Sequence, residues 1–178
     1  YDKRGNVAQV NDYYVNVTTK FSYDLIGRII GITSTDGQNL RYNYDNLNRL
    51  KMSKWSLNNI ALTSEYIYGD TAVSGQKANI IYGVKTNGIE DLKYTYDELC
   101  RLKARTLETT TPYVTQYSYL EGEGIGTTTT LVKTVKNGND TLEYVYDELG
   151  NITSVKKNNV VIEQYTYDSL NQLTSATY

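Results

Sequence analysis

The side chains in this sequence that could do chemistry are tyrosines, aspartates and arginines. The chain has 19 tyrosines but no histidine, and Cys100 is its one cysteine. Without histidine, a Ser-His-Asp or Cys-His triad cannot form, and most zinc sites lose their usual ligand. A single cysteine excludes an internal disulfide framework and a thiolate metal cluster. What remains is acid–base or metal chemistry at aspartates and ring stacking at tyrosines.

Several aspartates stand four residues before an arginine. Glycoside hydrolysis needs two facing carboxylates, whereas each of these segments supplies one. Aspartate is also favoured at the first position of a type I turn, where its carboxylate accepts backbone N–H groups. We therefore interpret these aspartates as turn-forming residues with a neighbouring exposed ion pair, which is worth ~0–1 kcal/mol. The pairs are Asp24 with Arg28, Asp45 with Arg49, and Asp97 with Arg101.

The tyrosines occur mostly as Tyr-x-Tyr pairs, which place both rings on one face of a strand. Two interpretations stay open for them. Stacked rings could form a carbohydrate-binding platform. Alternatively, the rings pack between successive repeats, where an aromatic pair contributes roughly 0.5–1.5 kcal/mol beyond its buried area. Their regular recurrence favours packing, because a binding site needs only a few rings.

These residues belong to one repeat that is copied along the chain. The template is aromatic-x-Tyr-Asp-x-Leu/Ile-Gly/Asn-Arg/Asn/Gln-Leu/Ile, and its second aromatic recurs every 21 to 28 residues. Fourteen of the 19 tyrosines lie in it. The predicted structural motif comprises Tyr1, Asp2 and Gly5; Phe21, Tyr23, Asp24, Gly27 and Arg28; Tyr42, Tyr44, Asp45 and Arg49; Tyr66 and Tyr68; Tyr94, Tyr96, Asp97 and Arg101; Tyr117 and Tyr119; Tyr144, Tyr146, Asp147 and Gly150; and Tyr165, Tyr167 and Asp168.

Each repeat is predicted to contain two strands and two turns. The aspartate begins the first turn, and the Gly or Asn three residues later suits a left-handed conformation. Cys100 stands in that position in one copy, so we expect a partly exposed, inert free thiol. An apolar residue earlier in each strand extends the tyrosine face, as at Leu40, Leu92 and Val161. The second turn is marked by Asp36-Gly37, Asn58-Asn59, Asn87-Gly88, Asn137-Gly138 and Asn158-Asn159.

The fold class predicted from this pattern is all-β, an antiparallel meander of roughly sixteen strands at two per repeat. Residues 1–178 are predicted to form a single array of about eight units, two of them degenerate, near 66–90 and 117–140. We expect the chain to be a fragment of a longer one. An array of this kind has two open sheet edges, which predict self-association by edge pairing.

Charge and hydropathy exclude some partners. Lys plus Arg number 18 and Asp plus Glu number 20, which gives a net charge of −2 and no basic footprint for nucleic acid. The apolar stretches are too short to span a bilayer. We therefore expect no nucleic-acid partner, no membrane insertion, no cofactor and no metal.

The segment Tyr23-Asp24-Leu25-Ile26-Gly27-Arg28-Ile29 resembles the YD repeat, also called the Rhs repeat. Residues 1–7 and 146–152 resemble its Gly-Asn variant, and the resemblance covers essentially the whole chain. Such repeats occur in bacterial Rhs and wall-associated polymorphic toxins, in insecticidal toxin complexes and in teneurins. The family's Pro-rich core and self-cleaving aspartate site have no counterpart in this sequence.

The resemblance implies a strip of β-hairpins that curves or spirals into a hollow shell. It further implies a non-catalytic structural segment, secreted or on the bacterial cell surface, whose partners are the rest of the shell and an enclosed toxin domain. The alternative is a carbohydrate- or cell-wall-binding or adhesion module that uses exposed tyrosines. An enzyme is the third and least favoured class.

Overall fold

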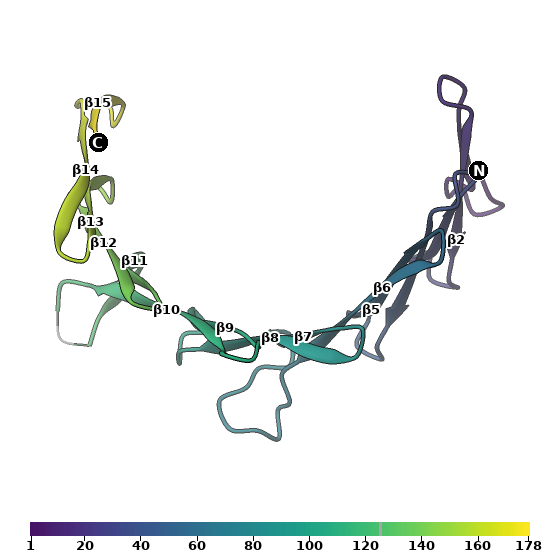
Figure 1. The fold of residues 1–178 in the computed structure, drawn as a ribbon, viewed down its shortest axis with the longest axis horizontal. Helices are drawn as coiled ribbons and strands as arrows, with labels where there is room; N and C mark the ends of the chain where they lie inside the picture. The colour runs from purple at the N-terminus through teal and green to yellow at the C-terminus, as the bar shows by residue number, and fades with distance from the viewer. Residues whose placement is uncertain (125) are drawn as a thin grey trace. The chain divides into compact units, whose positions relative to one another are not determined.

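The computed structural model describes residues 1–124 and 126–178, and this part of the chain contains fifteen β-strands and no helix (Figure 1). Strands rich in Thr, Tyr, Val and Ile suit a pleated sheet. Their bounds are β1 (Gln9–Asp12), β2 (Val17–Tyr23), β3 (Ile29–Ser34), β4 (Asn39–Tyr44), β5 (Leu50–Leu57), β6 (Ile60–Tyr68), β7 (Ile81–Thr86), β8 (Ile89–Tyr96), β9 (Leu102–Leu107), β10 (Tyr113–Glu121), β11 (Thr128–Asn137), β12 (Asp140–Tyr146), β13 (Ile152–Lys157), β14 (Val160–Tyr167) and β15 (Leu173–Thr177).

The strands follow one another in sequence order from β1 to β15, which confirms the predicted all-β antiparallel meander. The described residues contain fifteen strands, where roughly sixteen were predicted. The copy that contains Tyr1 and Asp2 contributes the strand β1. The curvature that the family resemblance implies stays a prediction.

By its internal contacts the chain divides into two compact units, Tyr1–Asp91 and Leu92–Tyr178, and β8 crosses the division. Each unit is described by itself. The prediction of a single array of eight repeats stays a prediction. Residue 125, in the second degenerate copy, lies outside the described residues.

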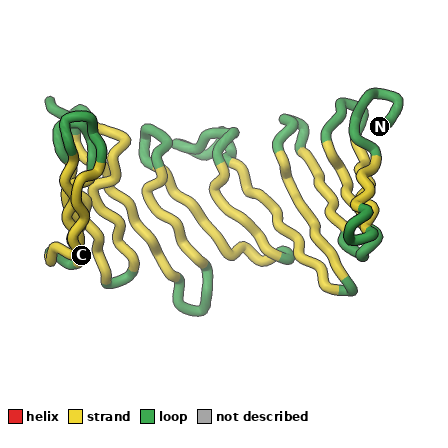
Figure 2. Tube along the Cα trace, turned by 90° about the horizontal axis from the view of Figure 1, so that it is seen from above, coloured by secondary structure: helices red, strands yellow, loops and turns green. Residues whose placement is uncertain are grey.

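Within each unit, the strand connections lie at the two ends of the strands (Figure 2). We call one end the turn edge. Its connections follow the second tyrosine of each copy, and residues 24–28 and 97–101 are examples. The other end, the hairpin edge, carries the short second turns, such as residues 58–59 and 158–159. Figure 1 shows the longest connection of unit 1, between β6 and β7, where the first degenerate copy has its insertion.

The hairpin edge uses the turn residues that the sequence predicted, with one correction. At 58–59 and 158–159 both asparagines have positive φ, between 46° and 69°, as a type I′ turn requires. The turn predicted at 137–138 is instead centred on Gly138 and Asn139, because Asn137 still pairs with Asp140 as the last strand residue. Gly138 has a φ of 58°, and the turn therefore begins one residue later than predicted.

The sheet is one layer thick, so its side chains are covered only by neighbours on the same face. Among the described residues, only Gly83, Thr115 and Val155 are buried, the last two with exposures of 3% and 6%. Domains usually bury one face of a sheet against a second layer, and no second layer occurs in residues 1–124 or 126–178. Burial therefore comes from rows of side chains that cross the strands.

The register shows such a row in unit 1. Its members are large apolar side chains on the tyrosine face, each directly opposite the next across a strand pair. Cross-strand pairs of this kind contribute about 0.2–1 kcal/mol each. The row runs through Phe21, Ile32, Leu40, Trp55 and Leu62.

One residue predicted on the tyrosine face lies on the other face. Val161 pairs with Lys156, whereas Glu163 pairs with Val155. The register shifts between these two pairs, and a one-residue slip moves a side chain to the opposite face. Glu163, and not the predicted Val161, therefore lies next to Tyr165 on the tyrosine face. No helix in the described residues is long and apolar enough to cross a membrane.

Candidate functional site

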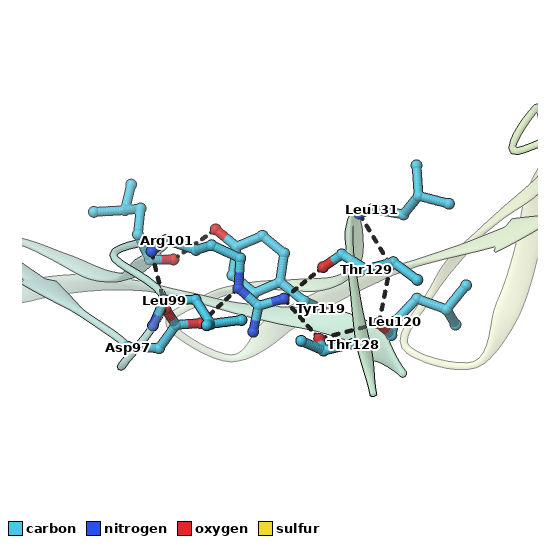
Figure 3. A network of polar contacts seen from close by, with 9 residues as sticks. Asp97, Leu99, Arg101, Tyr119, Leu120, Thr128, Thr129 and Leu131 are labelled. Carbon is cyan, nitrogen blue, oxygen red and sulfur yellow. Dashed lines mark hydrogen bonds and ion pairs between the residues drawn. The ribbon is translucent and has the colours of Figure 1, made fainter. Parts of the chain in front are cut away.

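The candidate site is the repeated cluster of tyrosine, aspartate and arginine at the turn edge. In each copy that has the aspartate, this carboxylate organises the turn. Asp97 Oδ1 accepts N–H bonds from Leu99 at 3.0 Å and from Arg101 at 2.9 Å (Figure 3). The same two bonds recur at Asp2, Asp24, Asp45, Asp147 and Asp168.

The turn also needs a left-handed residue one position before the basic residue. Cys100 has a φ of 62° there, and its thiol is free and half-buried. Positive φ costs a residue with a Cβ roughly 1–2 kcal/mol, so Gly and Asn are the residues that suit this position. The corresponding residues in the other copies also have positive φ, and they are Gly5, Gly27, Asn48, Gly150 and Asn171.

The second carboxylate oxygen binds the basic residue. Asp97 Oδ2 accepts the Nε–H of Arg101 at 2.6 Å, and the pairs Asp24–Arg28 and Asp45–Arg49 repeat this geometry. The predicted exposed ion pairs are in fact part-buried, with side-chain exposures of 18% to 29%. Asn151 takes over this role in a copy without arginine, since its Nδ2 donates to Asp147 Oδ2 at 3.0 Å.

These contacts set the charge of the aspartates. Partial desolvation raises the pKa of Asp97, but its bonds with the backbone and side chain of Arg101 lower it more, and the net pKa lies below the ordinary 3.8. The pKa values of Asp24 and Asp45 are lowered in the same way. All three are therefore ionised at neutral pH and accept hydrogen bonds at both carboxylate oxygens, which suits a turn former and not a proton donor.

The arginine links its own copy to the next one. The guanidinium carbons of Arg28, Arg49 and Arg101 lie 4.1 to 4.2 Å from the ring centroids of Tyr44, Tyr68 and Tyr119. Such cation–π contacts contribute about 0.5–1 kcal/mol at exposed sites and more when desolvated. Sequence reasoning missed this contact, because arginine and ring lie 16 to 19 positions apart.

The Nη1 group of the arginine also reaches the following turn. Arg28 Nη1 donates to Asn48 Oδ1 at 2.9 Å. Arg101 Nη1 donates to Thr128 Oγ1 at 2.7 Å and to the Thr129 carbonyl (Figure 3). Arg101 is therefore held by its own aspartate, by the next tyrosine ring and by the next turn.

The second tyrosine of a copy closes the same link with its hydroxyl, as in the copies of Tyr119 and the five tyrosines named below. Tyr119 Oη donates to the carbonyl of Leu102, one residue beyond Arg101, at 2.9 Å. Partial burial raises the pKa of Tyr119 above its ordinary value, which keeps the hydroxyl a donor. The same bond, at 2.7 to 3.0 Å, is made by Tyr23, Tyr44, Tyr68, Tyr146 and Tyr167.

The first aromatic of a copy lies on the same face, and in three copies it is opposite an aliphatic side chain. Phe21 pairs with Ile32, Tyr117 with Val135, and Tyr144 with Val155. Tyrosines of successive copies are two strands, or about 10 Å, apart. Directly across the strand pair, these three rings therefore face aliphatic groups, and the packing of one motif ring on another stays a prediction.

The degenerate copies keep the tyrosine and lose the aspartate turn. Tyr68 and Tyr119 still stack under an arginine and bond a carbonyl of the previous copy. After Tyr68, however, Arg49 Nη1 is buried without a hydrogen-bond partner. The insertion at 69–80 replaces the turn that the other arginines reach. The tyrosine link therefore tolerates an insertion that leaves one arginine donor unsatisfied.

The remaining candidate residues do not gather into a reactive site. In the described residues, no three of His, Cys, Asp and Glu lie together as a metal site would require. Unit 2 has a groove of about 480 Å³ on the face opposite the tyrosines. Hydroxyl, amide and ammonium groups line it, among them Gln116, Ser118, Thr134 and Lys136.

The fold and the site define a single-layer protein of repeated β-hairpins, joined copy to copy by Tyr–Arg–Asp clusters. No protein-family model and no curated protein matches the sequence. Similar solved structures include a mutant form of the Photorhabdus luminescens Tc holotoxin pore, with 24% identity over 89% of this chain and a TM-score of 0.43. Others are TcdB2-TccC3-Cdc42, with 22% identity over 94% and a TM-score of 0.42, and TcdB2-TccC3, with 23% over 90% and 0.43. The chain spans 7% to 8% of the length of these chains.

Proposed function

We propose that this chain is a non-catalytic structural segment of a YD-repeat (Rhs-repeat) shell, which encapsulates a toxin or effector within a larger bacterial protein that is secreted or on the cell surface. One observation carries the proposal. The side chains that could do chemistry are used in bonds between successive copies, as the Tyr119 hydroxyl bond to the Leu102 carbonyl shows. A wall held together by such nearest-neighbour links can be extended copy by copy.

The geometry argues against catalysis at the aspartates. Asp97 accepts two backbone N–H bonds and one guanidinium bond. A general acid needs a proton near neutral pH, and this carboxylate is ionised there. The motif residues are therefore proposed as structural, and the partners as the rest of the shell and the enclosed domain.

The test uses the full parent chain with its enclosed domain in place. We expect Tyr146→Phe with Tyr167→Phe to loosen unit 2 and to expose the enclosed domain to added protease at least tenfold faster. The matched control is Tyr13→Phe with Tyr14→Phe, because these two rings are 87% and 98% exposed and lie outside the motif. Cleavage of the enclosed domain at the unaltered rate, with faster hydrogen exchange in β12 to β15, would refute encapsulation.

A carbohydrate- or cell-wall-binding module is the second candidate, and the exposed pair Tyr13 and Tyr14 favours it. The carboxylate of Asp12 accepts the backbone N–H of Tyr14 at 2.9 Å, so the hairpin tip presents both rings to solvent from an ordered turn. Glycan-array binding that Tyr13→Ala and Tyr14→Ala abolish, and that Tyr146→Phe leaves intact, would support this function over the structural one.

A further inference from the structure

The strands of unit 1 carry more cations than carboxylates. Glu65 is the only carboxylate in strands β2 to β7, whereas the same strands contain five cations. The register places four of these cations on the face opposite the tyrosines, which we call the basic face, and the fifth, Lys51, lies at the register shift of β5. The four cations are Lys20, Arg41, Lys54 and Lys85.

Two cations of the basic face stand directly opposite each other. Arg41 in β4 pairs with Lys54 in β5, and both residues are exposed. Like charges at directly opposite positions destabilise a sheet. The other cross-strand partners are Gly31 beside Arg41 and Thr63 beside Lys54, so neither cation has a carboxylate opposite it. The stability of the sheet therefore does not account for this pair.

The remaining charges of unit 1 do not neutralise the pair. Glu65 stands directly opposite Lys85, so these two charges offset each other. The cross-strand partners of Lys20 are both uncharged. Arg28 and Arg49, by contrast, are bound by their own aspartates. The carboxylates of the nearby turns accept backbone N–H groups within those turns, and they are Asp12, Asp36 and Asp70. The basic face therefore keeps three cations that no ion pair in the described part of the chain neutralises.

A hollow of about 390 Å³ adjoins Lys54 at the hairpin edge of the basic face. Asn39, Ser56 and Ala61 line it from neighbouring strands, and residues 58–59 line it from the turn. The hollow thus offers carboxamide and hydroxyl groups next to an ammonium group. The Oδ1 atom of Asn39 is buried without a hydrogen-bond partner, and a rotation of this side chain would turn the oxygen toward the hollow.

These groups suit an extended polypeptide with carboxylate side chains. A guanidinium such as that of Arg41 can donate two parallel N–H bonds to one carboxylate, and clusters of arginine recognise acidic motifs in other proteins. Lys54 supplies a second positive charge beside it. The carboxamides of the hollow can pair with backbone N–H and C=O groups. A polypeptide carries both kinds of group at regular intervals along its length.

Other anionic partners fit this face less well. Single-stranded nucleic acid stacks its bases on aromatic side chains, and the register of β2 to β6 places every aromatic ring of these strands on the tyrosine face. Binding to an anionic membrane needs apolar side chains that enter the lipid beside the cations. The neighbours of Arg41 and Lys54 in their row are Gly31 and Thr63 instead.

We propose that the basic face of unit 1, at Lys20, Arg41, Lys54 and the adjoining hollow, binds an acidic segment of a partner polypeptide. The proposal goes beyond the proposed shell function and does not depend on it, because the tyrosine links lie on the other face of the sheet. It assigns a role to a pair of cations that costs the sheet stability.

The test measures binding of fluorescein-labelled poly-L-glutamate to the 178-residue chain by fluorescence anisotropy. At about 0.05 M NaCl, where screening is weak, Arg41→Glu with Lys54→Glu should weaken binding at least tenfold. Arg41→Lys keeps the charge and should stay within threefold. The matched control is Arg105→Glu with Lys133→Glu, which reverses one exposed arginine and one exposed lysine of unit 2 and should leave binding within twofold.

Lys54→Glu alone separates binding from folding. It places a carboxylate opposite Arg41, so the urea midpoint should rise while the affinity for poly-L-glutamate falls at least fivefold. A loss of affinity in a variant that is more stable than the unaltered chain cannot come from unfolding. A fall in the urea midpoint would show that Arg41 and Lys54 do not repel each other, and it would overturn the inference.

Three binding results would also overturn the proposal. They are no binding of poly-L-glutamate to the unaltered chain, an equal loss of binding in the unit 2 control, and tighter binding of single-stranded DNA or of phosphatidylserine vesicles than of poly-L-glutamate. The last result would assign the face to a nucleic acid or a membrane instead. None of these results changes protease protection of the enclosed domain, so this proposal and the proposed shell function fail separately.

Discussion

Arg101→Asn tests whether the arginine is the link between copies. Asn151 fills the same motif position naturally and keeps the bond to its aspartate, Asp147. The variant should therefore keep its own turn intact. It should lose only what Arg101 gives to the next copy, which is the stack on Tyr119 and the bonds to the following turn.

The magnitude follows from these contacts. A part-exposed cation–π contact contributes about 0.5–1 kcal/mol. Each hydrogen bond to the turn contributes about 1 kcal/mol net, reduced where the arginine side chain stays partly exposed. We expect Arg101→Asn to lower the free energy of unfolding of unit 2 by about 2 kcal/mol. The reverse change, Asn151→Arg, adds a cation beside Tyr167 and should raise it by about 1 kcal/mol.

The assay is urea unfolding followed by circular dichroism, together with hydrogen exchange. Arrays of repeats do not always unfold in one step, so exchange is needed to assign the loss to particular strands. The amides of β10 and β11 should exchange faster in Arg101→Asn, and those of β14 more slowly in Asn151→Arg. A change of less than about 0.5 kcal/mol in Arg101→Asn, or a destabilised Asn151→Arg, would refute the inferred link.

Three further outcomes follow from the structure. The pKa of Asp97 in the folded state lies below 3.8, so this carboxylate contributes its full stabilisation above that pH. The free energy of unfolding should fall as the pH drops below 3.8. In a pH series of urea unfolding, Asp97→Asn should show a smaller fall. The hydrogen bond to Glu163, aided by desolvation, raises the pKa of Tyr165 to about 12, so Glu163→Gln should return this pKa toward 10. The titration of Tyr165 is obtained as the difference between a protein and its Tyr165→Phe variant. A Tyr165 titration that Glu163→Gln leaves unchanged would contradict the contact. Cys100→Asn should raise the thermal midpoint, since Asn tolerates positive φ, with a gain of about 0.5 kcal/mol; a loss would show that the thiol packs better than the turn geometry indicates.

The local structure could be predicted from the sequence because its signals act within a few residues. Asp97 and the left-handed position at Cys100 define a turn on their own, and Tyr-x-Tyr defines a strand face. Because the same repeat recurs along the chain, a correct prediction for one copy extends to the whole meander. Val161 was predicted on the wrong face for a physical reason. A bulge shifts the register by one residue, and no residue type near it predicts the bulge.

The links between copies could not be predicted in the same way. The arginine–ring contact joins Arg28 to Tyr44, and both residues already had a sufficient explanation in their own copy. The aspartate–arginine pair was expected to be exposed because a single hairpin would leave it so. Only the next copy covers it, to side-chain exposures of 29% and 19% at Arg28 and Asp24. Burial in this protein is a property of two copies together.

This dependence explains how a one-layer sheet with almost no buried core holds its register. Little apolar surface is buried here, so directional hydrogen bonds must fix the register of the strands. The tyrosine hydroxyl bond fixes one strand against the strand before it, and the pair of Tyr68 and Leu50 keeps this bond without the aspartate turn. The aspartate shapes the turn, the arginine strengthens the link, and the tyrosine alone persists in the degenerate copies at Tyr68 and Tyr119. The excess of tyrosine in the composition is therefore explained by a one-layer sheet in which hydrogen bonds between neighbouring copies take the place of a buried core.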